Sequence, residues 1–324
     1  MSTEIKQKKQ DLGIFYTDQR IVSFIYDILS VWKAKEDEDL KRWESRKPHA
    51  HYPSVIDPAC GEGIFLKKAV ESGFTGYNPT HKVPYIFGID IDESVVDKWE
   101  SVELLNFFHE DRRAMKNHFY GQNGLLNLPN RKLPYKKMED GLVQFDAVVG
   151  NPPYGGIGLK EEEMRGKLAA SLLEYEIWKY AFDIQISKQG NMFGSMASQK
   201  DIVNRLRNMP IEILFLERFI QLAKPGGWIA IIIPDGILTN SNSHYVREFV
   251  SEKARVEAIV SLPRDAFKNV GTTAKTSILF LQKYKDQGKE RDLNYPVFLA
   301  SVESLEEKYF KIIKDAYQKH YTKI

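Results

Sequence analysis

The stretch SVIDPACGEG, at residues 54–63, decides the fold of this chain. Its first four residues form a short apolar strand, and the proline and glycines that follow indicate a tight turn before a helix that runs through Val70. Glycines at such a turn let the backbone approach a ligand closely, and the N–H groups at a helix start face a polar or anionic group. The stretch therefore predicts a strand, a ligand-binding turn and a helix.

The same alternation of strand and helix continues along the chain. A second strand is predicted at residues 85–89, with a helix from Glu93, and a third at residues 145–149. Repeated strand–helix–strand units form parallel sheets. Later strands are predicted at residues 228–233, 256–262 and 276–282, of which the last suits an antiparallel place at the edge of the sheet. We expect an α/β fold: a doubly wound, Rossmann-like, mostly parallel sheet with an antiparallel edge strand.

Helical spacing of apolar residues predicts the remaining elements. A first helix is expected within residues 12–29, after a short irregular stretch, and a second over residues 161–183. A third is expected over residues 211–224, where Pro225-Gly226-Gly227 ends the helix. We expect one domain over residues 1–284, in which residues 11–53 form an N-terminal helical region. Residues 285–324 then form a linker and a C-terminal helix near residues 303–320. The apolar residues of that helix are expected to pack on the core: Leu305, Tyr309, Ile312, Ile313 and Ala316.

Composition excludes some classes of protein. The 46 basic and 44 acidic side chains give a net charge of +2, which neither indicates nor excludes a nucleic-acid partner. A single cysteine, Cys60, excludes a disulfide framework and suits a reducing cytoplasm. The polar start and the lack of a long apolar run predict no secretory signal and no membrane span. His49 and His51 have no nearby ligand set, so we predict no catalytic metal.

Acidic residues after the second strand suggest an adenosine-containing cofactor. Asp90 can accept hydrogen bonds from both hydroxyls of a ribose, and Ile91 would then flank the adenine. The dinucleotide fingerprint requires a third small residue where this chain has Leu66, which disfavours a nicotinamide or flavin cofactor. An alternative is that Asp90 and Asp92 only favour the start of the next helix.

The tetrapeptide Asn151-Pro152-Pro153-Tyr154 stands at the carboxyl end of the third strand, where sites in such sheets form. An exocyclic amine of a nucleic-acid base is a poor nucleophile, because its lone pair is delocalised into the ring. The Asn151 side-chain oxygen and the Pro152 carbonyl can accept its two protons and direct the lone pair at a methyl group. Tyr154 offers a face on which a flipped base stacks. A Pro-Pro turn that merely ends a strand is the alternative.

Together these residues resemble the gamma class of amino-DNA methyltransferases, which includes modification subunits of type I restriction systems and fused restriction-modification enzymes. The resemblance rests on four motifs in the gamma order and on later blocks that cover most of the chain. The motifs are Phe15-Tyr16-Thr17, the glycine loop from Asp57 to Gly63, Asp90, and Asn151 to Tyr154. The later blocks are residues 216–227, 231–238, 256–267 and 276–283.

The resemblance implies S-adenosylmethionine as the cofactor and the N6 amine of a flipped adenine in DNA as the substrate. It implies that Thr17 touches the amino-acid end of the cofactor, that Asn123 lies near its adenine, and that Phe267 faces the flipped base opposite Tyr154. The expected catalytic residues are Asn151, Pro152, Pro153 and Tyr154. The expected cofactor residues are Tyr16, Thr17, Asp57, Ala59, Cys60, Gly61, Gly63, Asp90, Ile91 and Asn123.

The chain departs from the family pattern near its C-terminus. Family members carry a target-recognition domain or use a specificity subunit, whereas about forty residues follow the last motif here, fewer than a domain needs. We therefore expect sequence choice to come from such a partner or domain, within a restriction-modification or phage-defence system. Two alternatives remain: a methyltransferase acting on the side-chain nitrogen of a protein glutamine, which shares the Asn-Pro-Pro-Tyr motif, and a catalytically silent DNA-binding subunit.

Overall fold

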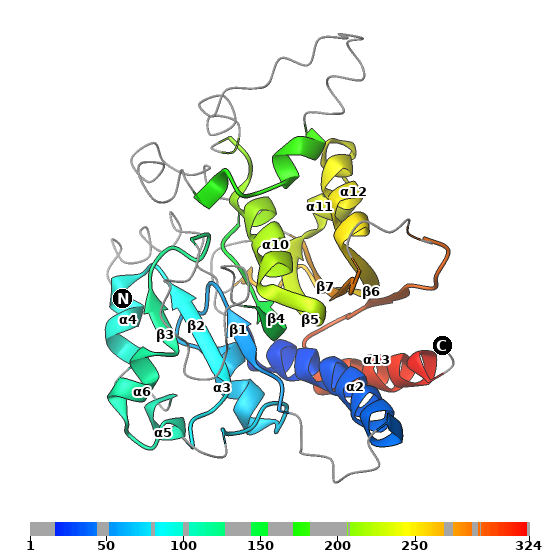
Figure 1. The fold of residues 1–324 in the computed structure, drawn as a ribbon. Helices are drawn as coiled ribbons and strands as arrows, with labels where there is room; N and C mark the ends of the chain where they lie inside the picture. Colours follow the sequence, from blue (N-terminus) through cyan, green and yellow to red (C-terminus); the bar gives the residue numbers. More distant parts are fainter. Residues whose placement is uncertain are drawn as a thin grey trace.

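The computed structural model describes residues 17–43, 52–78, 82–99, 104–126, 144–154, 171–181, 206, 208–268, 275–286, 291 and 293–322. This part of the chain forms one eight-stranded sheet in the order β3-β2-β1-β4-β5-β7-β6-β8 (Figure 1). The strands are β1 (Val55–Asp57), β2 (Ile86–Asp90), β3 (Phe119–Gly121), β4 (Phe145–Gly150), β5 (Ala223–Pro234), β6 (Ala254–Ser261), β7 (Thr276–Lys283) and β8 (Phe298–Ser301).

All neighbouring strands are parallel except where β7 pairs with β5 and β6, to both of which it runs antiparallel. The predicted α/β class, with its mostly parallel sheet and antiparallel strand, is confirmed. One detail differs, because β7 lies between β5 and β6 and the sheet continues beyond it to β8.

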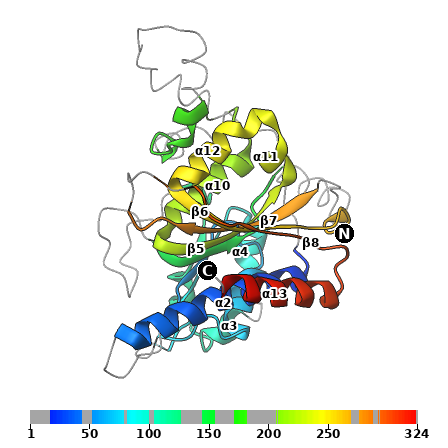
Figure 2. The ribbon, with the colours of Figure 1, turned by 90° about the vertical axis from the view of Figure 1, so that its right-hand side faces the viewer.

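Helices cover both faces of the sheet, because the central strands are apolar on both sides (Figure 2). On β5, Trp228, Ala230 and Ile232 belong to one core, and the alternating Ile229, Ile231 and Ile233 belong to the other. The first core includes residues of α2 (Gln19–Trp43), α3 (Ile64–Glu71), α4 (Glu93–Trp99), α5 (Leu104–Phe107), α6 (Arg112–Lys116) and α13 (Glu307–Tyr321). The second includes residues of α10 (Ile211–Leu222), α11 (Asp235–Thr239) and α12 (His244–Lys253), with the short η1 (Ser241–Ser243) between the last two.

Several predicted helices have different bounds. The first, α2, continues past its expected end at Leu29 to Trp43. α10 ends at Leu222, and Lys224 is already in β5, because an irregularity in the β4–β5 pairing accommodates the Pro-Gly-Gly segment within the strand. The predicted helix at residues 161–183 is interrupted at residues 173–176. There the N–H groups of Glu176 and Ile177 donate to the Glu217 carboxylate instead of to helix carbonyls. Residues 161–170 and 182–183 lie outside the described residues.

The C-terminal segment contributes to the sheet and to the core. Strand β8 was not predicted, because an edge strand that pairs only with β6 needs no apolar run, and its Leu299 is 70% exposed. In α13 the buried residues are Phe310, Ile313 and Tyr317. Ile312 and Ala316, which we expected in the core, are exposed, Ile312 to 62%.

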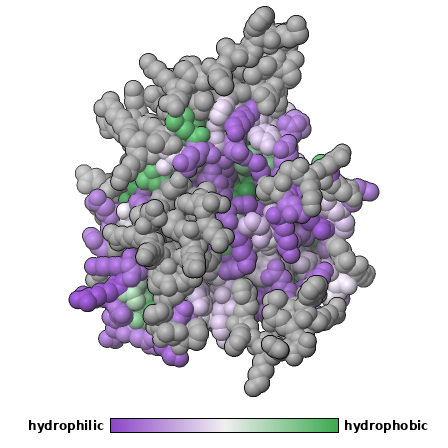
Figure 3. Space-filling model, viewed as in Figure 1, coloured by the Kyte–Doolittle hydropathy of each residue, from purple (hydrophilic) through white to green (hydrophobic). Residues whose placement is uncertain are grey.

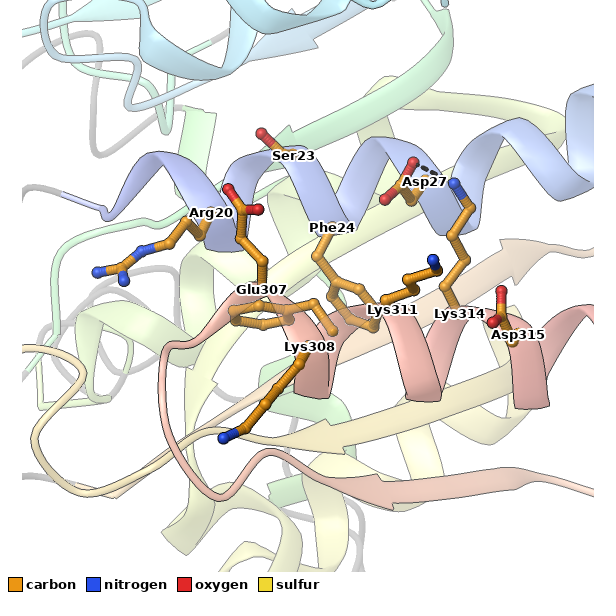
Figure 4. Close-up of a pocket in the computed structure, with 10 residues that line it drawn as sticks. Arg20, Ser23, Phe24, Asp27, Glu307, Lys308, Lys311, Lys314 and Asp315 are labelled. Carbon is orange, nitrogen blue, oxygen red and sulfur yellow. Dashed lines mark hydrogen bonds and ion pairs between the residues drawn. The ribbon is translucent and has the colours of Figure 1, made fainter.

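Charged side chains of α2 and α13 surround a groove of about 510 Å³ between the two helices (Figure 4). Lys314 forms an ion pair of 2.7 Å with Asp27 across it, and Phe24 and Phe310 meet at 5.1 Å between ring centroids. The described surface in Figure 3 is mostly hydrophilic, with small apolar areas. Among the described helices, none is both long and apolar enough to cross a membrane.

Replacing Phe310 by Ala should therefore lower the free energy of unfolding by about 3 kcal/mol, because it removes a buried aromatic ring from the contact between α13 and α2. The matched control is Ile312→Ala on the same helix. This variant should change the free energy of unfolding by less than about 0.5 kcal/mol. Urea unfolding of both variants gives the two values. Equal losses would contradict the packing of α13.

Strand β3 has a weak sequence signal, and buried aromatic contacts hold it in place. His118, at its start, is fully buried, and its Nδ1 donates to the Ile86 carbonyl at 2.8 Å. The imidazole stacks on Phe87 at 4.5 Å between centroids and meets Phe108 edge-on at 5.1 Å. Burial lowers the pKa of His118 to about 4, so this ring is neutral at pH 7.

This pKa predicts how stability changes with pH. Because the folded-state pKa is depressed, the unfolded chain binds the proton first, and stability falls as pH decreases from about 6.5 through about 4. Over that range the wild-type chain should lose about 3 kcal/mol more unfolding free energy than His118→Gln does. The control Gln318→Ala, at an exposed position of α13, removes no titratable group and should keep the wild-type dependence. Parallel pH profiles for wild type and His118→Gln would refute the assignment.

Candidate functional site

The parallel strands β1, β2, β3 and β4 bring the predicted site residues to one edge of the sheet. Asp57 ends β1, Asp90 ends β2, and Asn151 directly follows β4. The register places Asp57 beside Gly88 of β2, and Asp90 beside Gly121, the last residue of β3. Residues predicted from separate motifs therefore meet at the carboxyl edge, where such sheets bind ligands.

The glycine loop after β1 is fixed to β2 by backbone hydrogen bonds. The Cys60 N–H donates to the Ile89 carbonyl at 2.9 Å, and the Gly61 N–H donates to Asp90 Oδ2 at 2.7 Å. Gly61 and Gly63 have φ angles of 50° and 82°, which other residues rarely adopt. A side chain added at Gly61 would have no atom within 4 Å. The loop is therefore rigid and borders open space at Gly61.

Two side chains of this loop, those of Asp57 and Cys60, are buried. The Asp57 carboxyl is 1% exposed and accepts the Ala59 N–H at 3.0 Å, so it shapes the turn, and burial raises its pKa well above the usual range. The Cys60 thiol faces β2, since a side chain at Gly88 would lie 2.8 Å from its sulfur. Burial raises the pKa of this thiol too. Cys60 therefore supports the loop through its backbone and presents no reactive thiolate.

The acidic residues after β2 make different contacts. Asp92 accepts the Ser94 N–H at 3.0 Å, as expected of a residue that caps the start of α4. Asp90 instead accepts the N–H groups of Gly61 and Asp92 and so joins the glycine loop to β2. Burial raises its pKa. Each carboxylate oxygen has a second lone pair that can accept a hydroxyl, and the apolar side chain of Ile91 beside it is 51% exposed.

The loop after β3 packs against the glycine loop. The Gln122 N–H donates to the Asp90 carbonyl at 2.9 Å, and Asn123 Oδ1 accepts the Leu125 N–H at 2.9 Å. A side chain on Gly124 would lie 1.9 Å from the carbonyl oxygen of Pro58, so only glycine permits this contact. Asn123 thus directly follows the residue that is bonded to Asp90, and its place near a cofactor adenine stays a prediction.

The Asn-Pro-Pro-Tyr segment lies next to the start of α2. The buried Asn151 amide donates from Nδ2 to Thr17 Oγ1 at 3.2 Å, whereas its Oδ1 atom, also buried, has no hydrogen-bond partner within the described part of the chain. Pro152 is buried and Pro153 is half-buried. An unsatisfied buried acceptor is costly, which marks Asn151 Oδ1 as a position for a ligand donor. Tyr16, the neighbouring prediction, lies outside the described residues.

Tyr154 and Phe267 come together from distant parts of the chain. Their rings meet edge to face, with centroids 6.5 Å apart and planes at 84°. Both side chains are at most 2% exposed. Burial raises the pKa of Tyr154, so the phenol is neutral. The two rings expected on either side of a flipped base therefore contact each other, and their role toward a base stays a prediction. A base would enter between them only if they moved apart.

Sequence reasoning missed the buried side chains behind the loop after β3. Arg218 of α10 donates to the Gly124 carbonyl at 3.1 Å, and the Tyr175 hydroxyl donates to the Leu125 carbonyl at 2.9 Å. The available signal was the charged pair Glu217-Arg218 inside an otherwise apolar helix. Among the described residues, no group of three His, Cys, Asp or Glu side chains is placed to hold a metal ion.

Comparison with known proteins agrees with this arrangement. The description "Eco57I restriction-modification methylase" matches residues 85–267, which is more than half of the chain. The chain belongs to this family. The matched segment includes Asp90, Asn151 to Tyr154, and Phe267.

Individual relatives are distant and longer. The type II methyltransferase M.BstVI of Geobacillus stearothermophilus is 21% identical over 306 residues, which cover 90% of this chain and 46% of that protein. The type I restriction enzyme EcoEI methylase subunit of Escherichia coli is 23% identical over 86% of this chain and 44% of its own length. The chain thus spans about half the length of these curated relatives.

A solved structure supports the fold. The type I restriction-modification system methyltransferase subunit from Streptococcus thermophilus matches 94% of this chain and 53% of its own length, with a TM-score of 0.54 and 16% identity. At that identity the likeness concerns the fold alone.

The close contact between the two loops yields a prediction about Gly124. Gly124→Ala should lower the free energy of unfolding by about 1–3 kcal/mol, because the added methyl group meets a backbone oxygen that cannot move without moving the glycine loop. Gly236→Ala in α11 is the matched control, since its methyl group would meet only the movable end of the Asn240 side chain. It should change stability by less than about 0.5 kcal/mol. A harmless Gly124→Ala in urea unfolding would mean that the loops are not in contact.

Proposed function

We propose that this chain transfers a methyl group from S-adenosylmethionine to the N6 amine of a flipped adenine in DNA, within a restriction-modification system. The observation that carries the proposal is the buried Asn151 Oδ1 atom at the carboxyl end of β4, which has no hydrogen-bond partner among the described residues. Membership of a restriction-modification methylase family supports DNA as the substrate.

The proposed chemistry follows from the placement of Asn151. Its Nδ2 is held by Thr17, which leaves Oδ1 as the acceptor for one proton of the substrate amine. The Pro152 carbonyl is proposed as the acceptor for the second proton. With both protons bound, the nitrogen becomes tetrahedral and its lone pair points at the methyl group. Positioning then does most of the catalysis, and no strong base is required before transfer. Transfer would release S-adenosylhomocysteine, and the methylated amine would lose one proton to water.

The glycine loop fits the proposed cofactor. Its backbone borders open space at Gly61, Asp90 retains lone pairs for ribose hydroxyls, and Ile91 exposes an apolar face for an adenine. Asn123, in the loop after β3, is proposed to border the same site. S-adenosylmethionine bound there supplies an electrophilic methyl group. Thr17, through its contact with Asn151, would join the cofactor side of the site to the substrate side.

Tyr154 and Phe267 are proposed to hold the flipped base. Stacking on an aromatic ring contributes about 1–3 kcal/mol per base and tolerates any base, so selection of adenine falls to the contacts around Asn151. When a base is flipped out of the duplex, its exocyclic amine can enter a buried pocket. DNA, together with a specificity subunit or a target-recognition domain, is the partner set that this proposal implies. A DNA substrate and a single buried cysteine fit a cytoplasmic enzyme.

The two alternatives make other demands on the same site. A glutamine methyltransferase would use the same amide chemistry on a protein, but the family match favours DNA. A silent DNA-binding subunit has no need for an unsatisfied buried acceptor next to an aromatic pair.

Methyl transfer to unmethylated genomic DNA tests the proposal, with radiolabelled S-adenosylmethionine as the donor and nucleoside mass spectrometry to identify the product. The wild-type chain should produce N6-methyladenine. Asn151→Ala should lower kcat by about 100-fold or more, because it removes an acceptor that acts on the developing charge. It should still bind the cofactor.

The control Asn106→Ala, at an exposed position of α5, should keep the wild-type rate. Label in N4-methylcytosine would refute adenine as the target, and label in protein glutamine would refute DNA. If the wild-type chain bound the cofactor but labelled no DNA, methyl transfer to DNA by this chain alone would be refuted.

A further inference from the structure

A buried network behind the proposed cofactor site joins α10 to the loop after β3. Arg218 is fully buried, and it donates from Nε to the Gly124 carbonyl and from Nη2 to the Leu126 carbonyl. The Tyr175 hydroxyl donates to the Leu125 carbonyl between them. Three consecutive carbonyls thus accept hydrogen bonds from two buried side chains.

A second part of the network fixes these side chains in turn. Glu217, beside Arg218 in α10, accepts the N–H groups of Glu176 and Ile177 at 2.6 and 2.9 Å, which holds the segment that carries Tyr175. Gln221, one turn further along, donates to Glu217 Oε1 and accepts from Arg218 Nη1, both at 3.1 Å. The acid, the arginine and the tyrosine therefore act as one unit.

The direction of these contacts indicates what the unit does. Burying an arginine is costly, and helix packing alone would be served by an apolar residue. Here the guanidinium and the phenol hold a short loop that has almost no freedom on its other side, where Gly124 lies against the Pro58 carbonyl of the glycine loop. The same loop begins with Asn123 and is bonded to Asp90 through Gln122. The position of the 123–126 loop therefore determines how much space lies between the carboxyl ends of β2 and β3.

We propose that Arg218 and Tyr175 are positioning residues that hold the 123–126 loop as the wall of the adenine subsite, so that they determine affinity for S-adenosylmethionine without acting in methyl transfer. This inference rests on the proposed function, because it takes that corner as the binding place of the cofactor. Preorganising a loop in its bound position strengthens binding by removing the cost of ordering it. The chemical step, at Asn151, depends on other contacts.

The test compares two conservative variants with a matched control. Tyr175→Phe removes only the hydroxyl that donates to Leu125, and Arg218→Lys keeps the charge but loses the planar fork that reaches two carbonyls. The control Tyr317→Phe removes a hydroxyl that is equally buried and bonded to Trp32, on the opposite face of the sheet. Isothermal titration gives the Kd of S-adenosylmethionine in the absence of DNA, and thermal unfolding confirms that each variant is folded.

We expect binding about fivefold weaker for Tyr175→Phe and about tenfold weaker for Arg218→Lys, with Tyr317→Phe within about twofold of wild type. In methylation assays the KM for the cofactor should rise by the same factors while kcat stays within about twofold. If Arg218→Lys does not fold, Tyr175→Phe alone decides.

Three results would overturn the inference. The first is wild-type affinity for S-adenosylmethionine in Tyr175→Phe and Arg218→Lys. The second is an equal loss of affinity in Tyr317→Phe, which would reveal general destabilisation. The third is a wild-type chain that does not bind S-adenosylmethionine at all, which would refute the proposed cofactor as well. A wild-type chain that binds the cofactor but labels no DNA would refute only the proposed function, because the affinities are measured without DNA.

Discussion

Parallel pairing of β1 with β2 and β4 is the constraint on which the site depends. It directs the carboxyl ends of these strands to one edge and brings Asp57, Asp90 and Asn151 together from positions far apart in the sequence. The hydrogen bond from the Gly61 N–H to Asp90 then fixes the glycine loop at that edge. Without this pairing the motifs would be separate turns with no shared chemistry.

Burial determines which of the gathered residues face a ligand. Asp57 and Cys60 are closed within the protein and support the loop, whereas Asp90 is partly open and Ile91 is exposed. Asn151 is different, since its side chain is buried while its oxygen lacks a described partner. Glu217 and Arg218 of α10 are different again, since their side chains hold neighbouring backbone. In the proposed function, Asp57, Cys60, Glu217 and Arg218 therefore give structural support, whereas Asp90 both supports the glycine loop and contacts the ligand.

Much of this could be predicted from sequence where the signal is local. The glycine loop, the strand ending at Asp90 and the Pro-Pro stop after β4 each follow from a few adjacent residues. The sequence did not reveal β8, which pairs at one edge only, or the break at Glu176, which exists because Glu217 offers a better partner for two N–H groups. Nor did it reveal that β6 and β8 continue the sheet beyond β7. These features depend on partners distant in the chain.

The most direct test of the account is a crystal structure of the chain grown with S-adenosylhomocysteine, which shares the adenosine of the proposed cofactor. We expect ribose hydroxyls on the Asp90 carboxylate, adenine between Ile91 and the 123–126 loop, and the sulfur directed toward Asn151. A ligand bound away from the glycine loop, or bound there without contact to Asp90, would contradict it.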